Sequence, residues 1–166
     1  MINFVLDTKY VRLKIQTNFE GKNSWKLKVF SDSNWAGEPE RRISVTGFIV
    51  YLQDLPVCWN SKAQRGVPLS SSDAEYVAMY EAVKKIRFIY FILCEIWIKV
   101  EFPIVVKTDN VGALFISQNS LTGVRSRHVD TRYHFVRENM EEGFVKIEFI
   151  KSSDSDSDIF IKNVSQ

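Results

Sequence analysis

A long amphipathic run between two strand-like runs constrains the fold of this chain more than any other feature. Residues 73–99 place apolar side chains at steps of three and four, which predicts one helix packed on a sheet. A short apolar strand, residues 104–106, follows directly after Pro103. A strand reached through a long helix is most simply parallel to its neighbour in the sheet. The stripe expected to face the sheet consists of Glu75, Met79, Ala82, Ile86, Ile89, Leu93 and Trp97.

The runs on either side of this helix complete an α/β pattern. Residues 26–33, 45–52 and 55–60 read as three antiparallel strands, and Pro56 favours an edge position for the third. Later residues predict helices over 110–117 and 129–142, a strand over 144–150 and a short helix over 158–164. The order β-β-β-α-β-α-α-β-α is typical of a mixed sheet flanked by helices. Residues 1–26 read as the tail of a preceding segment and a linker, so the predicted domain covers 27–166.

The composition fits one globular, intracellular domain. Hydrophobic residues make up 45% of the 166 residues, which is enough for a core. The formal net charge of +2, from 22 basic and 20 acidic residues, does not by itself predict a nucleic-acid partner. Cys58 and Cys94 lie in apolar runs, so we expect buried, reduced thiols. The longest uncharged apolar run, residues 88–94, is too short to span a membrane.

Three acidic residues stand at the ends of the predicted elements. Asp32 lies in the first strand, Asp109 closes the fourth, and Glu75 heads the helix stripe. A strand, a helix and a strand in this order bring three carboxylates together, and such groups repel one another unless a cation joins them. Oxygen ligands select Mg²⁺ or Mn²⁺, and two such ions ~4 Å apart support phosphodiester hydrolysis. A fourth carboxylate would complete the site, and its candidates are Asp154, Asp156 and Asp158.

Several of these residues also have a structural interpretation. Ser72 and Glu75 have the spacing of a capping box, in which Glu75 would complete the helix N-terminus. Asp32 and Asp109 also fit ordinary turn residues at strand ends. Trp35 and Trp59 suit stacking on nucleotides, but their places in strands favour core packing.

The chain contains the motifs SDSNWAG at 31–37, RRISVTGF at 41–48, WNSKAQ at 59–64, LSSSDAEYVA at 69–78, DN at 109–110, RHVDTRYHFVRE at 127–138 and DIFIK at 158–162. Together these motifs resemble the ribonuclease H domain of copia-type LTR retrotransposon Pol polyproteins. They cover residues 27–164 in the family's order and spacing. Ala63 and Ile161 replace the family's usual Lys and Thr, and Asp73 replaces a usual Glu.

The resemblance implies a ribonuclease H fold with a five-stranded mixed sheet. It implies a nuclease that hydrolyses the RNA strand of RNA–DNA hybrids during reverse transcription, with two Mg²⁺ ions that Mn²⁺ can replace. Residues 2–15 look like the end of a reverse-transcriptase segment, so the reverse-transcriptase part of the same polyprotein is an expected partner. The expected location is the cytoplasm, within a virus-like particle. The expected catalytic and metal-binding residues are Asp32, Glu75, Asp109 and Asp158.

Two other functions remain open at this point. The departures at Ala63 and Ile161 are compatible with a catalytically reduced or domesticated module that binds nucleic acid or a polymerase segment. A related nuclease that acts on a DNA strand is the third hypothesis.

Substrate contacts are expected around the acids, because a hybrid duplex is read through phosphates and 2′-hydroxyls. The polar loop at 61–71 is one such contact, although it also fits a solvated loop. Asn110 also fits a helix N-terminus, and His128 also fits a structural histidine. The predicted substrate-binding residues are Ser33, Asn34, Lys62, Gln64, Ser71, Asn110, Arg127 and His128.

Overall fold

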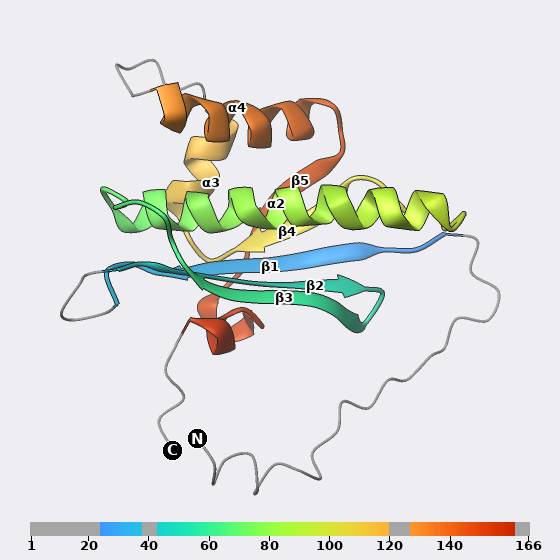
Figure 1. Cartoon of the computed structure of the whole chain (residues 1–166), viewed down its shortest axis with the longest axis horizontal. Helices are drawn as coiled ribbons and strands as arrows, with labels where there is room; N and C mark the ends of the chain where they lie inside the picture. The colour runs from blue at the N-terminus through green and yellow to red at the C-terminus, as the bar shows by residue number, and fades with distance from the viewer. Residues whose placement is uncertain (1–23, 38–42, 120–126, 162–166) are drawn as a thin grey trace, which may run out of the picture.

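The computed structural model describes residues 24–37, 43–119 and 127–161, with the backbone alone at 127–130. Its strands form one five-stranded mixed sheet in the order β3-β2-β1-β4-β5 (Figure 1). The pairs β1–β2 and β2–β3 are antiparallel, whereas β1–β4 and β4–β5 are parallel. The expected mixed sheet is therefore confirmed. The strands are β1 Leu27–Asn34, β2 Val45–Leu52, β3 Leu55–Ala63, β4 Ile104–Thr108 and β5 Val145–Phe149.

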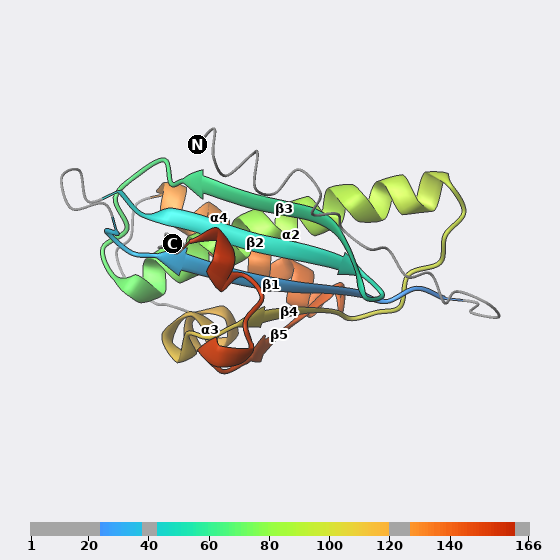
Figure 2. The same cartoon turned by 90° about the horizontal axis from the view of Figure 1, so that it is seen from below.

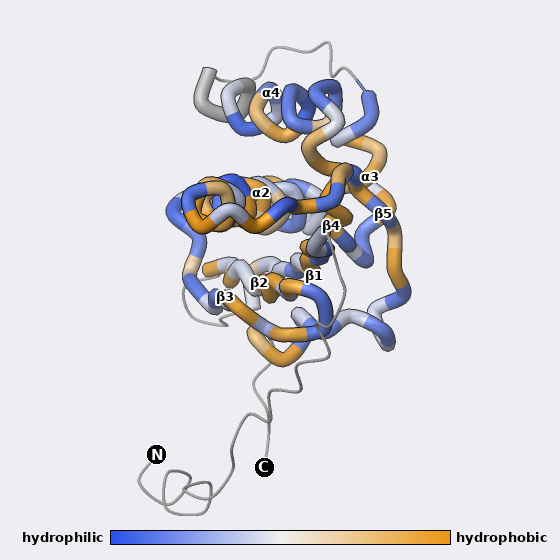
Figure 3. Tube along the Cα trace, turned by 90° about the vertical axis from the view of Figure 1, so that its right-hand side faces the viewer, coloured by the Kyte–Doolittle hydropathy of each residue, from blue (hydrophilic) through white to orange (hydrophobic). Residues whose placement is uncertain are grey.

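Helices lie on one side of the sheet in two layers. Helix α2, Ser71–Glu95, crosses from β3 to β4 and packs on the sheet, and α4, Arg127–Glu141, lies outside α2 (Figure 3). Helix α3, Val111–Gln118, follows β4. None of the helices in the described ranges has both the length and the apolar content needed to cross a membrane.

The core lies between α2 and the sheet, as the helix stripe predicts. Met79, Ala82 and Ile86 are fully buried, and Leu93 is 6% exposed. They pack with strand residues such as Val29 and with other apolar side chains of β2, β4 and β5. Alternation in the strands and the 3.6-residue period of the helix bring these side chains to the same interior.

The C-terminal end of α2 differs from the prediction. The helix was expected to continue to residue 99, but it ends at Glu95. Trp97 has a φ of 61° and is 92% exposed, so its place in the buried stripe was wrong. The turn is closed by hydrogen bonds from the Trp97 amide to the Cys94 carbonyl, at 3.0 Å, and from the Ile98 amide to the Leu93 carbonyl, at 2.9 Å. A left-handed turn stops the helix where its sequence period would allow it to continue.

Strand β3 forms an edge of the sheet, as Pro56 indicates. Its side chains are therefore less covered than those of the central strands. Trp59 on this strand is 57% exposed and Trp35 after β1 is 48% exposed, so the prediction of core packing for both was wrong. The prediction of two buried thiols was also wrong, since Cys58 is half-buried and Cys94 is exposed.

The end of the described chain crosses the face of the sheet opposite α2 (Figure 2). It contains two 3₁₀ turns, η1 at Ser152–Asp154 and η2 at Asp158–Phe160. The helix expected over 158–164 is thus a single turn in its described part, and residues 162–164 lie outside the described residues. Of the predicted tail and linker at residues 1–26, residues 1–23 also lie outside them.

Candidate metal centre

Three acidic side chains from three elements meet at one edge of the sheet. Asp32 is in β1, Asp109 directly follows β4, and Glu75 is in the second turn of α2. Strands β1 and β4 are parallel neighbours, so their carboxyl ends lie at the same edge. One carboxylate oxygen of each residue lies within 4.8 Å of the other two. The structure thus brings together the three acids that the sequence singled out.

Ser33 fixes one oxygen of each of the two buried acids. Its backbone amide lies 2.7 Å from Oδ1 of Asp32 and 3.0 Å from Oε1 of Glu75. Its hydroxyl also donates to Oε1 of Glu75, at 2.9 Å. Ser33, which directly follows Asp32 in β1, therefore holds the Glu75 carboxylate in place, and its predicted contact with substrate stays a prediction.

The remaining oxygens of these acids are the chemically unusual part of the site. Oδ2 of Asp32 and Oε2 of Glu75 are buried and have no hydrogen-bond donor among the described residues. Asp32 is 3% exposed and Glu75 is 5% exposed, so water does not readily serve them. Buried polar atoms are nearly always satisfied, and an unmet pair of carboxylate oxygens fits a bound cation. The oxygen-only donor set favours Mg²⁺ or Mn²⁺ over zinc.

Burial and mutual repulsion both act on these carboxyl groups. Burial raises the pKa of Asp32 well above its usual value, and the nearby carboxyl groups of Asp158, Glu75 and Asp109 raise it further. Burial also raises the pKa of Glu75, although the hydrogen bonds from Ser33 partly oppose this. A cation among the three acids would reverse both shifts, because it favours the charged form of each carboxylate.

The capping interpretation of Glu75 is wrong. The N-cap of α2 is Ser70, whose hydroxyl accepts a hydrogen bond from the Asp73 amide at 3.1 Å. The Asp73 carboxylate in turn accepts from the Leu69 amide at 3.0 Å. The cap thus lies two residues upstream of the predicted one, and its second hydrogen bond goes to the amide before the N-cap rather than to the N-cap amide of a capping box. Glu75 is therefore available to the acidic cluster.

The three candidates for a fourth acid, Asp154, Asp156 and Asp158, lie in different environments. Asp158 lies beside Asp32, close enough for their carboxyl groups to share a proton and so raise the pKa of Asp32. Asp156 instead accepts a hydrogen bond from the phenol of Tyr51, whose pKa is raised to about 12, mainly by burial. Asp154 accepts from the hydroxyl of Ser153, at 3.1 Å. Of the three, Asp158 is the one placed beside the cluster.

A glycine on β2 allows this loop to approach the sheet. Gly47 is paired with Asp32, and a Cβ at Gly47 would lie 2.6 Å from Cγ2 of Ile161. The carbonyl of Phe160 accepts from Ser61 Oγ at 2.5 Å, and that of Ile161 accepts from Asn34 Nδ2 at 3.3 Å. The close packing of η2 on β2 therefore sets the position of Asp158. The sequence signal for this contact was the glycine inside an apolar strand, which often marks a close approach of backbone.

The other predicted substrate residues fall into different environments. Asn110 caps α3 by accepting from the Ala113 amide at 2.9 Å, as its structural interpretation predicted. Gln64 donates to Thr46 Oγ1 and to the Ala74 carbonyl, both at 3.0 Å, so it ties the end of β3 to α2. Ser71 and Lys62 are exposed, Asn34 is half-buried, and the side chains of Arg127 and His128 lie outside the described residues.

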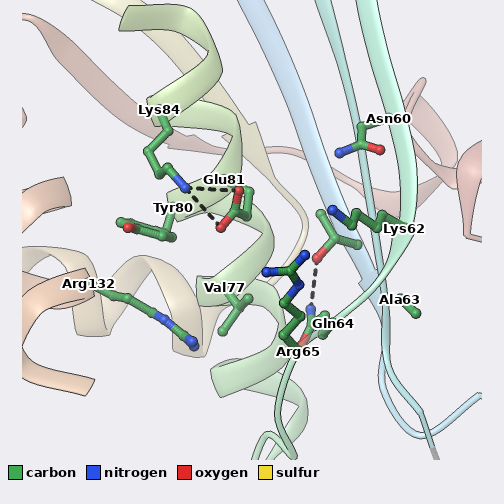
Figure 4. Close-up of a pocket in the computed structure, with 11 residues that line it drawn as sticks. Asn60, Lys62, Ala63, Gln64, Arg65, Val77, Tyr80, Glu81, Lys84 and Arg132 are labelled. Atoms are coloured by element: carbon green, nitrogen blue, oxygen red, sulfur yellow. Dashed lines mark hydrogen bonds and ion pairs between the residues drawn. The ribbon is translucent and has the colours of Figure 1, made fainter. Parts of the chain in front are cut away.

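The substrate contacts predicted for the loop at 61–71 did not anticipate that part of this loop lines a groove. The groove has a volume of about 370 Å³ and lies between the end of β3, the outer side of α2 and α4 (Figure 4). Its basic side chains come from three elements, so no local sequence pattern groups them. Lys84 is paired with Glu81, whose carboxylate is the one acidic group among the lining residues. The basic residues are Lys62, Arg65, Lys84 and Arg132.

Solved structures share this arrangement of elements. LC11-RNase H1 in complex with an RNA/DNA hybrid has a TM-score of 0.59 and 14% identity, over 82% of this chain and 94% of that chain. The foamy viral protease-reverse transcriptase in complex with dsDNA has a TM-score of 0.58 and 13% identity, over 91% of this chain and 28% of that chain. The five-stranded mixed sheet with its acidic edge is thus the ribonuclease H fold.

Sequence relatives place the chain more narrowly. It is 33% identical over 144 residues to the retrovirus-related Pol polyprotein from transposon RE2 of Arabidopsis thaliana, a match that covers 87% of this chain. It is 32% identical over 138 residues to that from transposon TNT 1-94 of Nicotiana tabacum. The matched region is 10% of the length of each polyprotein. No protein-family model matches the chain. The chain is a ribonuclease H-fold segment homologous to copia-like retrotransposon Pol polyproteins.

Proposed function

We propose that this chain is a metal-dependent endoribonuclease that hydrolyses the RNA strand of RNA–DNA hybrids during reverse transcription. The observation that carries this proposal is the pair of buried, donorless oxygens on Asp32 and Glu75, within reach of Asp109. Buried carboxylates in this state stay charged only beside a cation, and the fold and the relatives both fit a nuclease.

The four acids act together as metal ligands in this proposal. Asp32, Glu75, Asp109 and Asp158 would hold two divalent cations, which supply an activated water and charge stabilisation at the scissile phosphate. Ser33 holds the Glu75 carboxylate in place through two hydrogen bonds. Ser152 donates to Oδ2 of Asp109 at 2.5 Å and orients that carboxylate. These contacts fix the ligand oxygens before substrate arrives.

The basic groove supplies the contacts that the small net charge alone would not predict. Lys62, Arg65 and Arg132 line it with no acidic partner in the groove other than Glu81, which Lys84 engages. A row of cations beside an acidic metal site suits the phosphate backbone of a nucleic acid strand. Gln64 links the groove to the start of α2, because its side chain donates hydrogen bonds to Thr46 and to the first turn of α2. The groove therefore supports a duplex substrate held next to the metal centre.

A panel of duplexes tests the proposal. Labelled RNA–DNA, RNA–RNA and DNA–DNA duplexes are incubated with the chain in Mg²⁺, in Mn²⁺ and in chelator. We expect cleavage of the RNA strand of the hybrid alone, with no cleavage in chelator. Cleavage of DNA–DNA would replace the proposal with a deoxyribonuclease, and binding of the hybrid without cleavage in either metal would replace it with a non-catalytic module.

A further inference from the structure

The last turns of α2 carry an exposed apolar surface. Phe88 and Phe91 are each 57% exposed and Ile92 is 46% exposed, and their steps of three and four residues place them on one face. Ile96 and Trp97 continue this surface beyond the helix end, at 57% and 92% exposure. We call these five residues the α2 terminal patch. Contiguous exposed apolar surface of this kind marks interaction sites.

Packing within the described chain covers this patch only in part. Helix α4 covers the first part of α2, where the rings of Tyr80 and Phe135 meet at 5.5 Å. Past the end of α4, Arg87 pairs with Glu142 at 3.0 Å, and the ring of Tyr90 packs on those of Phe144 and Phe102 at 5.4 and 5.3 Å. Helix α2 extends past the end of α4 (Figure 1), and on this last part Phe88, Phe91 and Ile92 stay about half exposed. The inner face of these turns belongs to the core, and the outer face is left for a partner.

Trp97 shows that the exposure is built into the backbone. Its φ of 61° lies in the left-handed region, which bulky residues seldom adopt. The turn is nevertheless fixed by the amides of Trp97 and Ile98, which donate to carbonyls of α2. The turn thus holds the Trp97 side chain at 92% exposure. Aromatic residues held in this way are typical anchors of protein–protein interfaces.

The polypeptide enters the domain beside the patch. The amide of Trp25 donates to the Lys99 carbonyl at 2.8 Å, and the amide of Glu101 donates to the Trp25 carbonyl at 2.9 Å. Ser24 also bonds Glu101, at 2.6 Å. Residues 24 and 25 therefore lie beside residues 99–101, a few positions after Trp97. In the Pol polyproteins that match this chain, 90% of the length lies outside the matched region.

We propose that the α2 terminal patch is the surface on which the preceding, reverse-transcriptase part of the polyprotein packs. Phe88, Phe91 and Trp97 are its aromatic anchors. The continuity of the chain favours this occupant over an unrelated partner, because tethering gives the upstream segment a high effective concentration at the patch. The proposal goes beyond the nuclease function and rests on the homology to Pol polyproteins. The patch lies about 20 Å along α2 from Glu75, so its role is separate from cleavage.

Alkylation of Cys94 provides a direct readout of docking. Cys94 is exposed among the patch residues on α2, and half-buried Cys58 on β3 is an internal reference. Iodoacetamide labelling, followed by peptide mass spectrometry, is compared between this chain and a longer polyprotein that includes the reverse-transcriptase part. We expect Cys94 to react about tenfold more slowly in the longer protein, with Cys58 unchanged. Equal rates at Cys94 would overturn the proposal.

Two variants of the longer protein complete the test. Phe88→Glu with Phe91→Glu should restore fast labelling of Cys94. Phe115→Glu is the matched control, since Phe115 is 60% exposed on α3 and should leave the protection intact. Protection that persists in the double variant would contradict docking at the patch, as would dimers of this chain alone that the double variant abolishes in light scattering. Hybrid cleavage by this chain alone, measured in parallel, should not change in the double variant, so failure of docking and failure of the nuclease proposal remain distinct.

Discussion

Asp32 and Glu75 differ from ordinary buried acids in how their two oxygens are treated. One oxygen of each is bonded by Ser33, and the other is buried without a donor in the described chain. The sequence predicted that these acids converge with Asp109, because strand and helix ends fix where each side chain begins. It did not predict which oxygen each acid leaves free, since that depends on the rotamers that packing selects.

A substitution of Asp32 tests, in the metal-free protein, the free-energy cost of burying its charged carboxylate. Because burial raises the pKa of Asp32, the folded state keeps a proton that the unfolded state loses above the usual value of 3.8. The unfolding free energy should therefore fall as pH rises from about 5 to about 8. Asp32→Asn should flatten this fall and stabilise the metal-free protein at the upper pH. Urea unfolding in chelator measures both effects, and an equal slope in the variant would contradict the account.

The position of Asp158 depends on how turn η2 packs on β2. Turn η2 can lie on β2 because Gly47 has no Cβ, and the carbonyls of Phe160 and Ile161 are bonded by Ser61 and Asn34. The sequence predicted a helix at this place, but the short Ser/Asp-rich segment gives little periodic signal. Its structure comes from contacts with residues 99 and 127 positions away, which local patterns do not contain.

Gly47→Ala tests the role of this close contact. The added Cβ would meet Cγ2 of Ile161, so η2 and Asp158 should move away from the sheet. We expect a loss of about 1–3 kcal/mol in unfolding free energy and a marked fall in hybrid cleavage. Adding Ile161→Ala removes the clashing methyl and should recover part of the cleavage. Full activity in Gly47→Ala alone would show that the approach of η2 does not position Asp158.

The N-terminus of α2 shows a similar limit of sequence patterns. Both Ser70–Asp73 and Ser72–Glu75 have capping-box spacing, and local sequence does not choose between them. The structure chooses Ser70, because Glu75 is drawn into the cluster by Ser33.

Ser70→Ala should therefore cost about 1 kcal/mol of unfolding free energy through loss of the cap. Its effect on cleavage should be small, because Ser70 is not in contact with the acids. Ser71→Ala is the matched control for stability, since Ser71 is exposed and Ala has the higher helix propensity. Thermal or urea unfolding of both variants measures the difference, and equal stabilities would contradict the assigned cap.

At the scale of the whole molecule, the order of elements and the sheet topology could be predicted from hydrophobic periodicity. The faces that remain uncovered could not. Trp35, Trp59 and Trp97 were expected in the core. In the structure Trp35 follows the end of β1, Trp59 lies on the edge strand β3, and Trp97 lies beyond the end of α2. Periodicity assigns a side chain to a face, whereas burial depends on whether another layer covers that face. The basic groove was missed for the same reason, because its cations come from three separate elements.

Metal binding should stabilise the whole domain, because the acids join β1, α2 and β4. A ligand that binds only the folded state at about a hundred times its dissociation constant adds ~2.7 kcal/mol. We expect Mg²⁺ to raise the melting temperature of the wild-type chain and to have little effect on Glu75→Gln. Calorimetry with and without chelator measures this. An equal Mg²⁺ effect in both proteins would place the cation elsewhere.

The most direct test of the central claim is cleavage of an RNA–DNA hybrid in Mg²⁺ by the wild-type chain and by Asp109→Asn. Asp109 is half-buried, and the substitution keeps its size, so the variant should fold as the wild type does by circular dichroism. The account predicts cleavage of the RNA strand by the wild type and a loss of several orders of magnitude in the variant. Equal cleavage rates in the two proteins would contradict it.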